Sequence, residues 1–295
     1  MNDEHEHEAK SSSSGRRLVR LLRNLAVIGL LVAIAVRLTG LAESLFYWPS
    51  PGSVTTPVWY EDVEFITPDG VTLHAWFMPA RGVEAGERAP AILHAHGNAG
   101  DVASHESFSR FLTDAGFHVL LFDYRGYGQS ESGGRPNRDR LTIDTLAALD
   151  ALIARDDVDT RRVGVLGVSL GGAFALRVAA EDQRVRSVAT MSAFSSWWRV
   201  ANDAAPGFGW LLIPRGIEPE RSAAALGDRP LLVMHGLGDN TVRPHHAERL
   251  KVSAANAGVP VERWIHPTAG HNDLVQSYTE PRQVLIDFFN RTLTR

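Results

Sequence analysis

Residues 162–172 have the sequence RVGVLGVSLGG, and this stretch decides the fold. A Val-rich run typical of a buried strand stops at Gly167, and an Ala-rich helical pattern follows from Leu170. The pattern Gly-x-Ser-x-Gly lies between them, with Ser169 at its centre. Such a pattern also occurs by chance, but between a strand and a helix it predicts a sharp turn that exposes the serine hydroxyl. We therefore predict that Ser169 is a nucleophile at a helix N-terminus.

The composition of the chain limits the classes of protein to which it can belong. It has 295 residues, 44% of them hydrophobic, and a formal net charge of −4. After an N-terminal leader, roughly 240 residues remain, which suits one large α/β domain. The charge and the lack of a basic stripe argue against nucleic acid as a partner. With no cysteine, the sequence excludes disulfides, thiolate chemistry and cysteine-based zinc sites.

The N-terminal leader differs in composition from the rest of the chain. Residues 1–17 are polar and are predicted to be disordered, because they cannot bury a core. Residues 18–45 are predicted to form a transmembrane anchor, although the uninterrupted apolar run of residues 25–36 is shorter than the ~20 residues that cross a bilayer. Arg23 and Arg37 lie near the ends of the span, where their side chains can reach the interface. A cleaved signal peptide is the alternative, but no clear cleavage site follows the apolar run.

The positive charges around the apolar run are asymmetric. Arginines at positions 16, 17, 20 and 23 precede the run, whereas residues 38–80 contain no Lys or Arg. By the positive-inside rule, we expect a single-pass protein of the cell membrane with a cytoplasmic N-terminus. The remainder of the chain is then expected on the outer face of the membrane.

Residues 46–295 are predicted to form a single α/β domain. Two strands at residues 63–67 and 71–77 flank Pro68-Asp69-Gly70, a pattern typical of a hairpin. Short apolar runs then alternate with helical patterns, which predicts a mostly parallel sheet covered by helices on both faces. The further strands are expected at residues 91–95, 118–122, 163–168, 185–191, 231–235 and 261–266. The helices are expected at residues 102–115, 141–155, 170–180, 244–257 and 278–294.

Residues 194–229 interrupt the alternation of strands and helices. The segment holds Trp197, Trp198, Phe208 and Trp210, and its aromatic content argues against disorder. We predict a small cap insertion over the site. Trp197, Trp198 and Trp210 are predicted to line an apolar substrate pocket, and the alternative is that they only pack the segment on the sheet.

The predicted nucleophile needs a base within hydrogen-bond reach and an acid that orients the base. Because a parallel sheet presents its functional groups at the carboxyl ends of its strands, both partners are expected just after later strands. Asp239 follows the strand at 231–235, and His271 follows the strand at 261–266. The predicted catalytic residues are therefore Ser169, Asp239 and His271, in an order typical of this kind of site. Four other residues compete for these roles. His235 and His266 lie at strand ends and are predicted to be structural, Asp228 precedes its strand and so lies at the wrong edge of the sheet, and Asp273 fits an exposed helix N-cap.

Acyl transfer also needs an oxyanion hole, two backbone N–H groups that stabilise a negatively charged oxygen. One is predicted at Leu170, directly after the serine. The other is predicted at Asn98, in the loop of residues 96–100 that follows a strand. His94 and His96 lack a third ligand at suitable spacing nearby, so neither a metal nor a cofactor is expected.

Five motifs carry a resemblance to a known family. They are residues 96–100, 123–130, 167–171, 235–239 and 270–271. In this order they resemble the α/β-hydrolase superfamily, and most closely its serine-aminopeptidase-like and membrane-anchored abhydrolase branches. The resemblance extends from Val58 to Thr294 and implies that residues 123–130 form a structural turn near the site. Because these branches contain esterases, thioesterases and peptidases, the resemblance does not determine the substrate.

The sequence as a whole indicates a serine hydrolase of the esterase or thioesterase type that works through an acyl-enzyme. Its expected partners are a small-molecule or lipid-like acyl substrate and the membrane around its N-terminal helix. The alternatives are a serine peptidase or aminopeptidase-like hydrolase, an acyltransferase, and a non-catalytic binding protein with this fold. The presence of Ser169, Asp239 and His271 together favours an enzyme over a binding protein.

Overall fold

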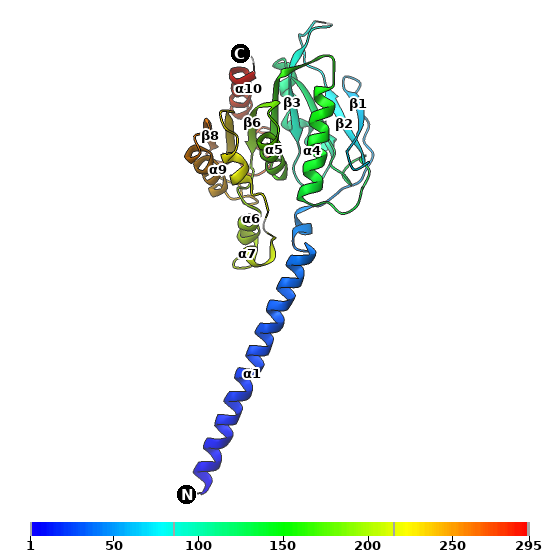
Figure 1. The fold of residues 1–295 in the computed structure, drawn as a ribbon. Coiled ribbons are helices and arrows are strands. Elements are labelled where there is room, and N and C mark those ends of the chain that lie inside the picture. Colours follow the sequence, from blue (N-terminus) through cyan, green and yellow to red (C-terminus); the bar gives the residue numbers. More distant parts are fainter. Residues whose placement is uncertain (1, 85, 215, 294–295) are drawn as a thin grey trace.

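The computed structural model describes residues 2–84, 86–214 and 216–293, with side chains from residue 17 onward. Within these ranges, eight strands form one sheet in the order β1-β2-β4-β3-β5-β6-β7-β8 (Figure 1). Strands β1, β2 and β4 pair antiparallel, and all further pairs from β4 to β8 are parallel. The predicted mostly parallel sheet with an antiparallel hairpin at one edge is therefore confirmed.

The strands lie close to the predicted apolar runs. One difference is that β5 begins earlier than predicted, because Val158 pairs with Ala89 before the register shifts. The strand bounds are β1 Glu61–Ile66, β2 Thr72–Met78, β3 Ala89–Ala95, β4 His118–Phe122, β5 Val158–Val168, β6 Val185–Met191, β7 Leu231–Gly236 and β8 Val261–His266.

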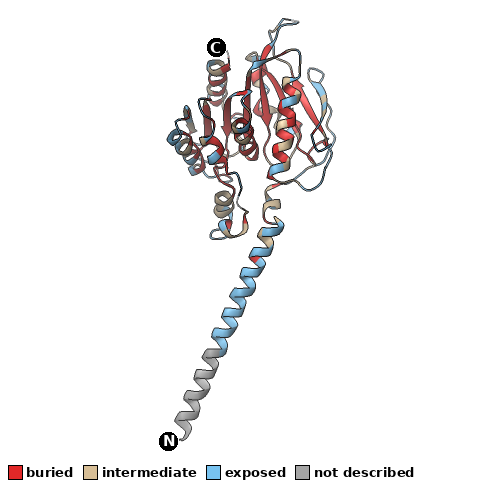
Figure 2. Ribbon diagram, viewed as in Figure 1, coloured by how far each residue is buried: buried red, intermediate tan, exposed pale blue. Residues whose placement is uncertain are grey.

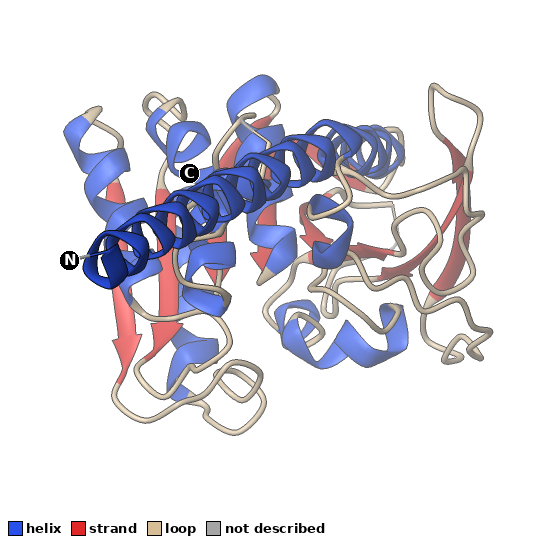
Figure 3. Ribbon diagram, turned by 90° about the horizontal axis from the view of Figure 1, so that it is seen from below, coloured by secondary structure: helices blue, strands red, loops and turns tan. Residues whose placement is uncertain are grey.

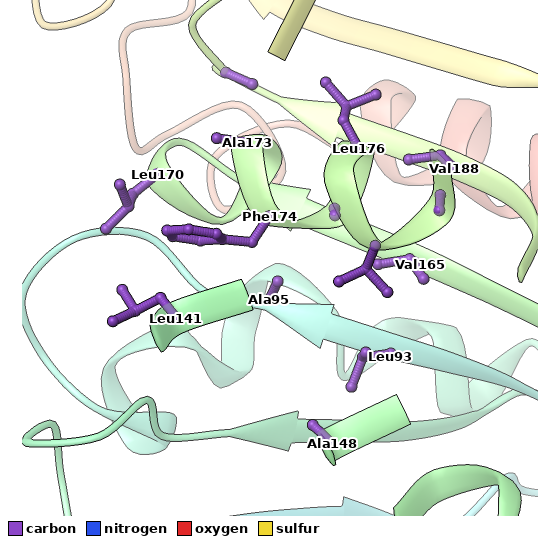
Figure 4. Packing of buried hydrophobic residues seen from close by; sticks show 14 of the residues in the cluster. Leu93, Ala95, Leu141, Ala148, Val165, Leu170, Ala173, Phe174, Leu176 and Val188 are labelled. Atoms are coloured by element: carbon purple, nitrogen blue, oxygen red, sulfur yellow. The ribbon is translucent and has the colours of Figure 1, made fainter. Parts of the chain in front are cut away.

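Helices cover both faces of the sheet. Successive side chains of a strand point to opposite faces, so the apolar strands present a hydrophobic surface on each face. Leu93 and Val165 pack in one core cluster, shown in Figure 4, whereas Ile92 and Leu166 pack in a second cluster. The first cluster lies under α4 Arg138–Ile153, α5 Leu170–Glu181, α8 Pro219–Ala224 and α9 His245–Asn256. The second lies under α2 Val102–His105, α3 Phe111–Asp114 and α10 Glu280–Leu293. Figure 2 shows the inner strands between these layers as buried, whereas the edge strands β1 and β8 are partly exposed.

The prediction of one continuous helix over residues 102–115 is wrong. The structure has α2, then the 3-10 helix η2 Glu106–Phe108, then α3. Ser109 has φ −138, outside the helical region, and its hydroxyl lies 2.8 Å from Nδ1 of the buried His94. Serine side chains that hydrogen-bond outside the helix favour non-helical backbone. The bond between Ser109 and His94 coincides with the break between η2 and α3.

Helix α1 Asn2–Thr39 extends away from the domain (Figures 1 and 2). The predicted disorder of residues 1–17 differs from the structure, in which the helix continues to Asn2. Extension of an existing helix costs far less free energy than nucleation of a new one, which accounts for this continuity. The stretch Arg17–Thr39 is long and apolar enough to cross a membrane, a property that a signal sequence near the N-terminus would share.

Helix α1 ends at a glycine turn. Gly40 has φ 65, the N–H of Gly40 donates to the carbonyl of Arg37, and the N–H of Leu41 donates to the carbonyl of Val36. This pair of bonds satisfies carbonyl groups that the helix end would otherwise leave free. The 3-10 helix η1 Glu43–Phe46 follows. The membrane-compatible helix therefore stops short of residue 45, where the predicted anchor ends.

Candidate active site

Ser169 occupies a strained turn between β5 and α5. Its φ of 51 and ψ of −115 lie in a region that residues with a side chain rarely adopt. A Cβ at Gly171 would lie 2.0 Å from the carbonyl oxygen of Ala95, and one at Gly167 would lie 2.5 Å from the Cα of Gly172. Both glycines are therefore required for the close approach of β5, α5 and β3, as the Gly-x-Ser-x-Gly pattern predicts.

The structure brings Ser169, His271 and Asp239 together in one hydrogen-bonded chain. His271 Nε2 lies 3.0 Å from Ser169 Oγ, and His271 Nδ1 lies 2.8 Å from Asp239 Oδ2. An ionised carboxylate can only accept, so Nδ1 donates to Asp239 and Nε2 is left to accept the serine proton. The arrangement has the geometry of a nucleophile, a general base and an orienting acid.

Asp239 is buried and is held in its ionised form. The N–H groups of Thr241 and Val242 each donate to Asp239 Oδ1 at 2.9 Å. Burial alone would raise the pKa of Asp239, but the hydrogen bonds from His235, His271 and Val242 outweigh it and place the pKa below its ordinary value. The carboxylate therefore remains charged across the pH range in which imidazole titrates, and it can stabilise a positively charged His271.

His235 is predicted from the sequence to be structural, but in the structure it contacts Asp239 of the site. Its Nε2 lies 3.1 Å from Asp239 Oδ2 and 2.8 Å from the carbonyl oxygen of Val242. The spacing of four residues between His235 and Asp239 is the only sequence signal that could have indicated this contact. His266, in contrast, accepts the N–H groups of Thr268 and Ala269 at Nδ1, as its predicted structural role requires.

The loop that carries Asn98 lies beside Ser169. Gly97, Asn98 and Ser169 line the same cavity, and the Asn98 side-chain oxygen accepts the N–H of Trp48 at 2.8 Å and the hydroxyl of Tyr127 at 2.9 Å. These bonds fix the loop next to Ser169. Leu170 begins α5, so its N–H has no partner within the helix. The oxyanion role of the Asn98 and Leu170 N–H groups stays a prediction.

A cavity of about 570 Å³ opens above Ser169 and His271; we name it the Ser169 cavity. Most of its wall is apolar, and it is formed by the cap helices α6 Trp197–Ala204 and α7 Gly209–Leu212 and by the chain that follows α1. The apolar residues that line it include Leu45, Phe46, Trp48, Val200, Phe208, Leu212 and Ile213. Among the described lining residues, none is acidic.

The prediction that Trp197, Trp198 and Trp210 line the pocket is wrong. Trp197 is buried in the core, with its ring centroid 4.8 Å from that of Phe194. Trp198 packs under the guanidinium of Arg199, and Trp210 is 63% exposed. None of the three lines the Ser169 cavity. The cap side chains that do face the cavity include Val200, Phe208 and Leu212.

Three residues near the cap have the composition of a metal site. Ligand atoms of Asp203, His245 and His246 lie within 4.8 Å of one another. The backbone N–H of Ser195 donates to His246 Nδ1, so the proton of the neutral ring sits on Nε2, which faces Asp203 Oδ2 at 3.2 Å. Burial, with the nearby charge of His245, lowers the pKa of His246 to about 4. Within the part of the chain that the structure describes, neither His246 Nε2 nor Asp203 Oδ2 has a hydrogen-bond partner. Because Nδ1 accepts the Ser195 N–H and the proton is on Nε2, the neutral His246 ring presents no free nitrogen lone pair to a metal ion.

Comparisons of the sequence with known proteins give a consistent result. A family model for the α/β hydrolase fold matches residues 90–212. The uncharacterized protein YfhR of Escherichia coli is 34% identical over 238 residues, which cover 80% of this chain and 82% of the relative. The Arabidopsis thaliana protein WAV2, described as an alpha/beta hydrolase domain-containing protein, is 32% identical and covers 77% of this chain and 80% of its own length.

Similar solved structures have the same fold. A Pyrococcus furiosus esterase superimposes with a TM-score of 0.68 at 21% identity, covering 84% of this chain and 99% of the esterase. A Pyrococcus horikoshii acylaminoacyl peptidase superimposes with a TM-score of 0.65 at 18% identity, covering 79% of this chain and 42% of the peptidase. At these identities the likeness concerns the fold and leaves the substrate open.

Proposed function

The chain belongs to the α/β-hydrolase family, and from this premise we propose that it is a serine hydrolase that cleaves acyl esters or thioesters through an acyl-enzyme. One observation carries the proposal: a chain of hydrogen bonds joins Ser169 to His271 and His271 to Asp239, and Ser169 and His271 line an apolar cavity. The strained turn exposes the Ser169 hydroxyl to that cavity. The acyl chain of the substrate occupies the cavity, and the scissile carbonyl lies above the hydroxyl.

In the first half-reaction, Ser169 Oγ attacks the carbonyl carbon while its proton moves to His271 Nε2. The charge of Asp239 stabilises the imidazolium that forms. The backbone N–H groups of Asn98 and Leu170 stabilise the negative carbonyl oxygen of the tetrahedral intermediate. The bond to the leaving alcohol or thiol then breaks, the leaving group takes the proton from His271, and the acyl group remains esterified to Ser169.

In the second half-reaction, water replaces the leaving group. His271 Nε2 takes a proton from the water as its oxygen attacks the acyl carbon, and the same proton then returns to Ser169 Oγ as the ester bond breaks. The products are a carboxylic acid and the free enzyme. An alcohol or amine in place of water would make the reaction a transfer, which the same groups support.

The shape and polarity of the cavity favour esters over peptides. A peptidase that binds a free α-amino group needs a carboxylate near it, and none of the described residues lining the Ser169 cavity is acidic. The acylaminoacyl peptidase with the same fold supports the alternative of a peptidase. A non-catalytic binding protein is disfavoured by the complete hydrogen-bonded chain from Ser169 to Asp239.

The preference for acyl chains is testable with nitrophenyl esters from acetate to palmitate. Each further methylene buried in the cavity adds up to ~0.8 kcal/mol, so kcat/KM is expected to rise about fourfold per carbon until the cavity is full. Aminoacyl nitroanilides serve as the matched amide series. A profile that is flat or falls beyond acetate, or faster cleavage of the anilides than of any ester, contradicts an acyl esterase.

We also propose that α1 is a retained, single-pass anchor with its N-terminus in the cytoplasm and the catalytic domain on the outer face of the cell membrane. The clustered arginines before the span support the orientation. The burial of Ala42 and Tyr47 within the domain supports retention, because cleavage near residue 43 would detach Ala42 from it. A reporter that is active only outside the cytoplasm, fused at the C-terminus, is expected to be active. A mature protein that starts near Glu43 would instead establish a cleaved signal.

A further inference from the structure

The segment that joins α1 to the domain, residues 40–48, is built into the domain; we name it the junction segment. The ring of Phe46 lies edge-on to that of the buried Trp197, with centroids 5.3 Å apart. Glu43 forms an ion pair with the largely buried Arg138 at 3.1 Å. The helix that can cross a membrane is therefore attached to the domain through fixed contacts.

The junction segment also forms one side of the mouth of the Ser169 cavity. Leu45 and Trp48 of this segment line the cavity, and so does Phe208 at the start of α7. All three are largely exposed as well, by 73%, 64% and 56% respectively. Apolar side chains that both line a cavity and face outward mark its mouth, so the rim of this mouth is an exposed apolar surface.

Arg37 holds the cap against the end of α1. Its Nη1 donates to the carbonyl oxygens of Trp210, Leu211 and Ile213, at 3.0, 3.3 and 2.6 Å. Arg37 lies within the last turn of the membrane-compatible stretch, which ends at Thr39. The backbone of Trp210 is thus hydrogen-bonded to the end of the membrane-compatible stretch, while the Trp210 side chain is exposed.

The cap, the mouth and the end of α1 lie at the same end of the domain. Figure 1 shows α6 and α7 beside the point where α1 leaves the domain, and Figure 3 views this end directly. If α1 spans a bilayer, the mouth lies where the membrane surface begins. Trp and large aliphatic side chains are the ones that favour this interfacial level.

We infer that the mouth of the Ser169 cavity rests on the bilayer and that the substrate is a long-chain acyl ester resident in the same membrane. The inference rests on the proposed hydrolase function. The acyl chain enters between the junction segment and the cap without passing through water, which avoids exposing its methylenes. The reaction at Ser169 is the hydrolysis already described, and the alcohol and the fatty acid are released toward the interface.

The test uses the full-length protein in phosphatidylcholine vesicles and two esters with one leaving group. Methylumbelliferyl oleate is placed either in the vesicles that carry the protein or in separate vesicles. Methylumbelliferyl butyrate is supplied from solution. The wild-type rate on oleate is expected to be at least about tenfold higher when protein and ester share a bilayer, because lateral entry needs no transfer through water.

A matched pair of tryptophan variants tests whether this end of the domain contacts the bilayer. Trp210 and Trp59 are both strongly exposed, at 63% and 71%, and neither lines the cavity, but only Trp210 lies beside the end of α1. Trp210→Glu is expected to lower the rate on oleate in the shared bilayer about tenfold and to leave the rate on butyrate within about twofold. Trp59→Glu is expected to leave both rates within about twofold.

The outcomes separate the two proposals. Equal wild-type rates on oleate in shared and separate vesicles would overturn entry from the bilayer, and this arm needs no variant. Equal effects of Trp210→Glu and Trp59→Glu on oleate would overturn contact of this end of the domain with the bilayer, because that contact predicts an effect of Trp210→Glu alone. In either case, hydrolysis of butyrate leaves the hydrolase function standing. Failure of the wild type to hydrolyse both esters would overturn the function itself.

Discussion

Replacement of Ser169 by alanine is expected to abolish turnover of every ester that the wild type cleaves. Without Oγ no acyl-enzyme forms, and the remaining groups supply only binding and oxyanion stabilisation. In comparable sites such a loss lowers kcat by about 10⁴–10⁶-fold. The variant is also expected to lose covalent labelling by a fluorophosphonate probe, because the probe reacts with an activated serine. Steady-state hydrolysis and gel-based detection of the labelled protein measure the two effects.

Ser192 offers a matched control for this experiment. It follows β6 as Ser169 follows β5, and it has the same φ of 51. Its hydroxyl donates to the carbonyl oxygen of His271 at 3.1 Å. Ser192→Ala is expected to remain labelled, since the nucleophile is intact. Labelling that persists in Ser169→Ala, or disappears only in Ser192→Ala, would show that a different serine is the nucleophile.

Replacement of His271 by alanine is expected to cost about as much activity as loss of Ser169. The three residues act as a unit: without the base, the hydroxyl at 3.0 Å cannot transfer its proton and stays a weak nucleophile. Asp239 is then left without the imidazole that it orients. The measurement is kcat/KM on a nitrophenyl ester, together with the rate of labelling by the fluorophosphonate probe.

His266→Ala is the control for His271→Ala. His266 accepts two backbone N–H groups and packs against Tyr278, with ring centroids 3.9 Å apart, so its loss affects the order of the loop that leads to His271. We expect reduced thermal stability and an activity within about tenfold of the wild type. An inactive His266→Ala beside a nearly normal His271→Ala would overturn the assignment of the base.

The alternation of strands and helices, and the positions of Ser169, Asp239 and His271, could be predicted from the sequence. These features depend on local patterns: the period of apolar residues, the glycines of a tight turn, and polar residues that directly follow strands. A parallel sheet brings the carboxyl ends of its strands to one edge, so that residues 102 and 32 positions apart meet there. Once the sheet is known to be parallel, Ser169, Asp239 and His271 are therefore expected at the same edge.

The sequence by itself determined the layers of the domain, the strained turn at Ser169 and the positions of Asp239 and His271 after later strands, because each follows from local periodicity or turn chemistry. Only the tertiary structure decided that Trp48 and Phe46 line the cavity while Trp197 lies in the core. It also decided that His235 contacts Asp239. Which side of an aromatic-rich cap faces the cavity depends on how the cap packs against the end of α1, far away in the chain, and no local pattern encodes that packing.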